Sequence, residues 1–152
     1  MSLLAPLLAL AATGCISYTP GSFRSPFGGA FPGVHSAIGC LDLALAQRFE
    51  PIARGPVIEY SFGNRCVSSV TVDLATAPVV VRRYGRDEAL LIVDPRREVR
   101  ALLLDGRWAG HEQIEYDGPR SMDEVCVDIS RIDGEARPMP EWVCAPLTDV
   151  PQ

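Results

Sequence analysis

Lysine is absent from this sequence: all 14 of its basic residues are arginine, and histidine occurs only twice. Acidic residues number 19, so the formal net charge is −5 at pH 7. A nucleic-acid-binding protein needs a basic face to contact the phosphate backbone. The charge balance therefore argues against nucleic acid as a partner.

The motifs of common catalytic sites are also missing. There is no Gly-x-Ser-x-Gly, no Gly-x-Gly-x-x-Gly, no phosphate-binding P-loop and no Cys-x-x-Cys. His35 and Ser36 are adjacent, but their Pro- and Gly-rich surroundings cannot hold catalytic geometry. The run HEQIE, from His111 to Glu115, lacks the second histidine of a zinc motif. An exposed strand edge is therefore favoured over the alternative, a metal site formed by His111, Glu115 and a nearby carboxylate. We expect no enzymatic activity, no cofactor and no metal.

The one prominent apolar run, residues 3–12 (LLAPLLALAA), is too short for a bilayer span of about 20 residues but matches the core of a signal peptide. It leads into Ala12-Thr13-Gly14-Cys15. A small residue before a cysteine at this point resembles the lipobox of bacterial lipoproteins.

That resemblance implies that the thiol of Cys15 carries a diacylglyceryl group and that residues 1–14 are removed as the signal peptide. Because Ile16 rather than aspartate follows the cysteine, it also implies the outer membrane, facing the periplasm or the cell surface. The alternative is an ordinary secretory signal that is cut elsewhere, with Cys15 incidental.

Residues 15–38 are rich in Pro and Gly and show neither a helical nor an alternating period. We expect a flexible, lipid-anchored tether that spans about 25–30 Å. Its four aromatic residues are unusual for a spacer; they favour contact with the membrane interface or the domain surface, or a short docking motif. They are Tyr18, Phe23, Phe27 and Phe31.

Residues 39–147 consist of short apolar runs separated by turn residues, with the alternation of half-buried strands. In 57–62, for example, Ile58, Tyr60 and Phe62 share one face. The spacing predicts one all-β domain, an antiparallel β-sandwich, which resembles small immunoglobulin-like domains in size and architecture. Residues 148–152 form a tail. The expected strands are 57–62, 70–74, 79–81, 90–93, 114–116 and 125–129.

Two segments of this domain fit more than one structure. Residues 41–52 are predicted as a strand because Leu41, Leu43 and Leu45 alternate, although a helical stripe also fits and Leu and Ala favour helices. Residues 95–104 have the marks of a short helix, with Asp94 as its cap and Gly106 at its end. A helical turn followed by a strand is the alternative there.

The five cysteines divide into Cys15 for lipid and four for disulfides, as expected of an exported domain. A hairpin turn centred on residue 135 places Cys126 opposite Cys144. A turn around residue 53 places Cys40 opposite Cys66, but the apolar faces then disagree unless one strand carries a bulge at 63–64. We predict the pairs Cys40–Cys66 and Cys126–Cys144, with buried free thiols as the alternative.

Arginine is concentrated in residues 82–107, which hold seven arginines and five acidic residues, whereas residues 112–149 are strongly acidic. Solvated loops that neutralise one another explain this pattern most simply. The alternative is a patch for an anionic glycan or lipid. Trp108 and Trp142 are either core residues or exposed anchors, and the pattern does not separate the two. The candidate patch is Arg82, Arg83, Arg86, Arg96 and Arg97.

These observations favour a non-catalytic, lipid-anchored envelope protein that acts as an interaction or structural module. Its expected partners are the membrane, through acyl chains on Cys15, and an envelope protein or glycan. Binding of an anionic ligand through the arginines is the first alternative. A protease inhibitor that acts through the loops at 84–88 and 94–97 is the second.

Overall fold

The computed structural model describes residues 16–48, 50–93, 101–118 and 124–146, and these residues form eleven β-strands and no helix. The all-β prediction is therefore confirmed. In this part of the chain there is no helix long and apolar enough to cross a membrane. The strands are β1 (Val34–Ile38), β2 (Leu41–Arg48), β3 (Val57–Asn64), β4 (Val70–Asp73), β5 (Val79–Arg83), β6 (Arg86–Ala89), β7 (Leu91–Ile92), β8 (Ala101–Leu104), β9 (Ala109–Asp117), β10 (Glu124–Asp128) and β11 (Trp142–Pro146).

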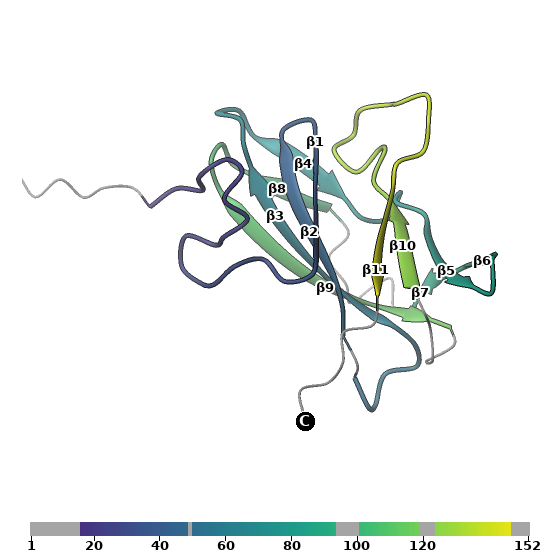
Figure 1. Ribbon diagram of the computed structural model, residues 1–152. Coiled ribbons are helices and arrows are strands. Elements are labelled where there is room, and N and C mark those ends of the chain that lie inside the picture. The colour runs from purple at the N-terminus through teal and green to yellow at the C-terminus, as the bar shows by residue number, and fades with distance from the viewer. Residues whose placement is uncertain (1–15, 49, 94–100, 119–123, 147–152) are drawn as a thin grey trace, which may run out of the picture.

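The strands pair antiparallel throughout and form two main sheets (Figure 1). One has the order β1-β2-β3-β9-β7 and the other β11-β10-β5-β6, while β4 and β8 form a two-stranded ribbon. Strand β11 contacts β1 and β2 across the space between the sheets. The arrangement is that of an antiparallel β-sandwich.

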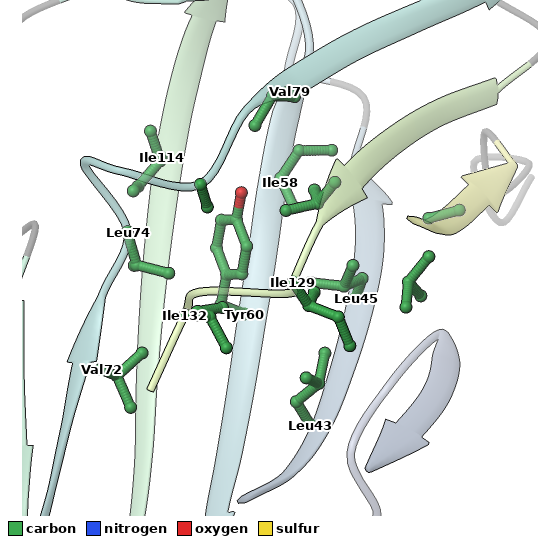
Figure 2. Packing of buried hydrophobic residues seen from close by; sticks show 14 of the residues in the cluster. Leu43, Leu45, Ile58, Tyr60, Val72, Leu74, Val79, Ile114, Ile129 and Ile132 are labelled. Atoms are coloured by element: carbon green, nitrogen blue, oxygen red, sulfur yellow. The ribbon is translucent and has the colours of Figure 1, made fainter. Parts of the chain in front are cut away.

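The core lies between the sheets, and β3 supplies its centre. Ile58, Tyr60 and Phe62 are fully buried on one face of β3, as the alternation predicts. Each such side chain contributes about 1.5–3 kcal/mol of burial free energy. Figure 2 shows Ile58 and Tyr60 among residues from β2, β4, β5, β9 and the segments that follow β4 and β10: Leu43, Leu45, Val72, Leu74, Val79, Ile114, Ile129 and Ile132.

The segment that fits both a strand and a helix is a strand, β2. Leu41, Leu43 and Leu45 enter the core, and β2 pairs along its whole length with β3. Pairing on both sides, with β1 and β3, outweighs the modest helix preference of Leu and Ala.

The short helix predicted near 95–104 is wrong for residues 101–104, where the strand of the alternative prediction is present. Residues 101–104 form β8, which pairs with β4 from Val70↔Leu104 to Asp73↔Ala101. A strand partner satisfies the backbone hydrogen bonds that a helix would otherwise make internally. Residues 94–100 lie outside the described residues.

The prediction of a flexible tether over 15–38 is wrong for residues 16–38. Residues 34–38 form β1, the edge strand beside β2, so the domain begins well before residue 39. Tyr18 and Phe31 are buried against Ala44 on the outer face of the sheet. Pro and Gly interrupt regular secondary structure, but an irregular segment can still bury its aromatic side chains. Cys15 lies outside the described residues.

Both predicted disulfides are present. Cys126 lies opposite Cys144 on β10 and β11, and Val127 lies opposite Val143, in the expected register. The Cys40–Cys66 disulfide joins residues just beyond the ends of β2 and β3.

The register of the β2–β3 hairpin differs from the expected one by a single residue. Leu43 pairs with Phe62, and the pairing continues without a bulge to Leu41↔Asn64. Cys40 accepts a backbone hydrogen bond from Arg65 at 2.7 Å, so Cys66 lies one position beyond the residue opposite it. The apolar faces therefore match without the bulge predicted at 63–64.

Candidate functional site

The β5–β6 hairpin carries the part of the candidate arginine patch that the structure describes. Its turn is Tyr84-Gly85, with φ of 49° and 74°. Two central residues with positive φ match the twist of the flanking strands in a two-residue hairpin. Tyr84 is 88% exposed at the tip, which projects from the sandwich on the side away from the N-terminal segment (Figure 1).

The arginines of this hairpin differ in their surroundings. Arg82 forms two hydrogen bonds with Asp87, at 3.0 and 3.2 Å, and this guanidinium lowers the pKa of the Asp87 carboxyl. Arg83 and Arg86 lie directly opposite each other, and the Arg83 guanidinium is 5.6 Å from the centre of the Tyr84 ring. Like charges across a strand pair repel.

Three members of the candidate patch, Arg82, Arg83 and Arg86, thus lie on one hairpin. Within the described residues, neither Arg83 nor Arg86 forms a salt bridge, so these two supply positive charge at the tip, whereas Arg82 is neutralised. Arg96 and Arg97 lie outside the described residues. An exposed tyrosine between two arginines suits an anionic surface, by charge and by stacking.

The expected inhibitor loop at 84–88 is not a loop. Residues 86–89 form β6 and only the two turn residues separate it from β5. A tight hairpin lacks the extended segment that occupies a protease cleft. The second expected loop, 94–97, lies outside the described residues.

A second cluster, which the sequence analysis missed, lies on the outer face of the five-stranded sheet. Asp42 is 1% exposed, and its Oδ2 accepts hydrogen bonds from the Tyr18 hydroxyl at 2.7 Å and the Gly21 N–H at 2.6 Å. Its other oxygen is 3.4 Å from Nε of Arg65. The Tyr18 ring covers Gly63, the residue opposite Asp42 on β3, where a side chain would collide with the ring.

The hydrogen bond from the Tyr18 hydroxyl to Asp42, with the Tyr18 ring over Gly63, is called the Tyr18–Asp42 clamp below. It changes the acidity of the Tyr18 hydroxyl. Burial, the hydrogen bond to Asp42 and the negative charge of that residue together raise the pKa of Tyr18 to about 12. The signal that could have revealed the clamp is Gly63, since a glycine inside a strand marks a close approach of another group.

A third cluster lies farther along the same face. Glu59 on β3 pairs with Arg48 on β2, and its other oxygen is 3.6 Å from Nδ1 of His111 on β9. A cavity of about 340 Å³ beside it is lined by Ser61, Phe31 and His111, among others.

The third cluster resembles a Ser-His-Glu arrangement only in composition. The 3.6 Å separation is too long for the hydrogen bond that orients a catalytic imidazole. In the described structure no hydrogen bond joins Ser61 to His111, although they lie opposite each other on β3 and β9. The group is therefore a charge cluster in which Glu59 balances Arg48.

The expected strand that carries His111 is present, and the His111 side chain is 54% exposed. In the described part of the chain, the three ligand-type side chains close enough for a metal are Glu124, Cys126 and Cys144. The two cysteines form a disulfide, so their sulfurs are not thiolate ligands.

No protein-family model, curated protein or solved structure matches this chain.

Proposed function

We propose that this protein is a non-catalytic lipoprotein of the bacterial cell envelope, anchored by acyl chains on Cys15, and that its β-sandwich acts as an interaction or structural module. The observation that carries the proposal is the presence of two disulfides in one small domain. Disulfides persist in oxidising compartments and are rare in the cytosol. They agree with the export signal and the lipobox-like residues that precede Ile16.

The decisive variant is Cys15→Ala, expressed in a bacterial host with a lipoprotein pathway. The wild-type protein is expected to incorporate labelled palmitate and to fractionate with membranes, whereas the variant loses the label and leaves the membrane fraction. Because acyl chains contribute about 0.8 kcal/mol per buried CH₂, their loss removes the anchor. Non-reducing electrophoresis checks that both proteins are oxidised alike. Equal membrane partition and labelling of the two proteins would contradict the proposal.

A second candidate function is the binding of an anionic glycan or lipid at the tip of the β5–β6 hairpin. It is favoured by Arg83 and Arg86, which oppose each other across the hairpin without a described salt bridge. The test compares Arg83→Ala/Arg86→Ala with Arg54→Ala/Arg131→Ala, a pair of exposed arginines elsewhere. Both double variants change the net charge equally.

The measurement is the salt concentration that elutes each protein from immobilised heparin. Loss of the tip arginines is expected to lower the elution concentration, and loss of the control pair to change it little, because local charge controls binding to an anionic surface. Equal elution of the two double variants excludes the tip as an anion-binding site.

A further inference from the structure

The Tyr18–Asp42 clamp fixes the chain very close to the proposed lipid anchor. The backbone N–H of Tyr18 donates to the carbonyl of Arg107 at 2.6 Å, and its hydroxyl donates to Asp42. Only three Cα–Cα steps separate Tyr18 from Cys15, a reach of at most about 11 Å. If Cys15 is lipidated, the surface around Tyr18 therefore lies at the membrane rather than on a long tether.

Three exposed apolar side chains gather at this end of the sandwich. Ile16 is 58% exposed, Val67 84% and Trp108 53%. Trp108 directly follows Arg107, whose carbonyl accepts the hydrogen bond from Tyr18. The N–H of Arg107 donates to the carbonyl of Cys66, the residue before Val67, at 3.0 Å.

The remaining contacts connect Val67 to the same place. The carbonyl of Val67 lies against Gly106, where a side chain would collide with it. β3 stops beside the start of β9, where the N–H of Asn64 donates to the carbonyl of Trp108 at 2.8 Å. The N-terminal segment reaches this end of the sheet through the hydrogen bond from Tyr18 to Arg107 (Figure 1). Three separate segments thus place apolar residues beside the point where the chain continues toward Cys15.

The composition of this surface matches a lipid interface. Tryptophan is enriched at the level of the lipid headgroups, where its ring is partly buried in apolar surroundings and its N–H keeps a polar partner. Aliphatic side chains enter the acyl boundary, and arginine extends its charge toward lipid phosphates.

We propose that Ile16, Val67 and Trp108 form a membrane-contact surface that lies among phospholipid headgroups beside the acyl chains, with Arg107 facing the lipid phosphates. The inference rests on the proposed lipidation of Cys15. It predicts that the domain lies directly against the bilayer, with the β5–β6 hairpin directed away from it and available to a ligand other than this bilayer.

The test uses the full lipidated protein in phospholipid vesicles with brominated acyl chains, which quench nearby tryptophan. Trp142→Phe leaves Trp108 as the reporter, and Trp108→Phe leaves Trp142, which lies on β11 in the other sheet. We expect brominated lipid to reduce Trp108 emission at least two-fold and to leave Trp142 emission nearly unchanged.

Two further variants, made in the Trp142→Phe protein, test the contact itself. Val67→Asp places a charge on the surface and is expected to halve the quenching. Ile52→Asp is the control: Ile52 is 94% exposed and lies in the β2–β3 connection, at the opposite end of β3 from Asn64.

The outcomes separate the two proposals. Mass spectrometry of the N-terminal peptide first establishes the lipid; its absence overturns the anchoring and this inference with it. If lipid is present and Trp108 is unquenched, or is quenched no more than Trp142, the membrane-contact surface is wrong and the anchor stands. Equal effects of Val67→Asp and Ile52→Asp also overturn it.

Discussion

Replacing Tyr18 with Phe removes one hydroxyl from the Tyr18–Asp42 clamp and tests whether the N-terminal segment belongs to the fold. The variant keeps the ring over Gly63 and its stacking on Phe31, whose centroid is 5.8 Å away. It deletes the 2.7 Å hydrogen bond to the buried Asp42. A hydrogen bond to a charged group contributes about 1.5–3 kcal/mol, so we expect a loss of about 2 kcal/mol in unfolding free energy at pH 8.

The pKa of Tyr18 gives the same contact a second signature, in the pH dependence of stability. It is about 12 in the folded protein and near 10 when unfolded. Because the folded-state value is the higher one, the phenolic proton contributes stability that is complete below pH 10 and is lost as the pH rises toward 12. At pH 11, one unit above the unfolded pKa, this proton's contribution to the unfolding free energy of the wild-type protein should have fallen by about 1.4 kcal/mol. The Tyr18→Phe variant has no such proton and should show no such loss.

The assay is urea unfolding at pH 8 and pH 11, followed by tryptophan fluorescence, with Tyr84→Phe as the control because Tyr84 is 88% exposed. The gap between wild type and Tyr18→Phe is expected to narrow on going to pH 11, whereas Tyr84→Phe should match wild type at pH 8. A Tyr18→Phe protein as stable as wild type, or a gap that does not change with pH, would refute the clamp.

Three further changes test the packing of Tyr18 and two other parts of the fold. Gly63→Ala places a methyl group where the Tyr18 ring lies and should lower the unfolding free energy by about 1–3 kcal/mol through overpacking. Gly29→Ala is the control: the space around Gly29 is open, so the urea midpoint should change little. Replacing Cys126 and Cys144 together by Ala should lower the unfolding free energy by about 3 kcal/mol through loop closure, and an unchanged melting temperature would argue against a stabilising disulfide. Arg137→Ala removes the guanidinium that lowers the pKa of the Asp133 carboxyl. Because the folded-state pKa is the lower one, the Asp133 carboxylate contributes stability above its unfolded pKa, and that stability is lost as the pH falls through the folded value. The variant should therefore be less stable by about 1–2 kcal/mol at pH 7, and urea unfolding should give a smaller difference at pH 2.

The inward-facing part of the fold could be predicted from the sequence because its pattern has a period of two. The alternation of Ile58, Tyr60 and Phe62 identifies the face of β3 that points into the core between the sheets, and that of Val125 and Val127 fixes the register in which Cys126 meets Cys144. One shift of register would move every apolar side chain to the other face.

The outer face could not be predicted in the same way. Asp42 and Glu59 occupy positions that the alternation assigns to solvent, yet both are buried. What covers the Asp42 end of that face is an irregular segment held by single contacts such as the Tyr18 hydroxyl, and no periodicity marks such contacts. The same limit applies to the hairpin tip: clustering of arginines is visible in the sequence, but the pairing of Arg82 with Asp87 depends on the strand register.

If the domain is anchored through Cys15, as proposed, the Cys40–Cys66 disulfide has a mechanical consequence. A pull on that end loads the Tyr18–Asp42 clamp first and then the pairing of β1 with β2, while the covalent link holds the next two strands together. Residues 16–39 would then peel away and lengthen to about 80 Å before the rest of the sandwich bears the force. The N-terminal segment would therefore unfold and lengthen under tension, while the disulfide-bonded body of the domain stays folded.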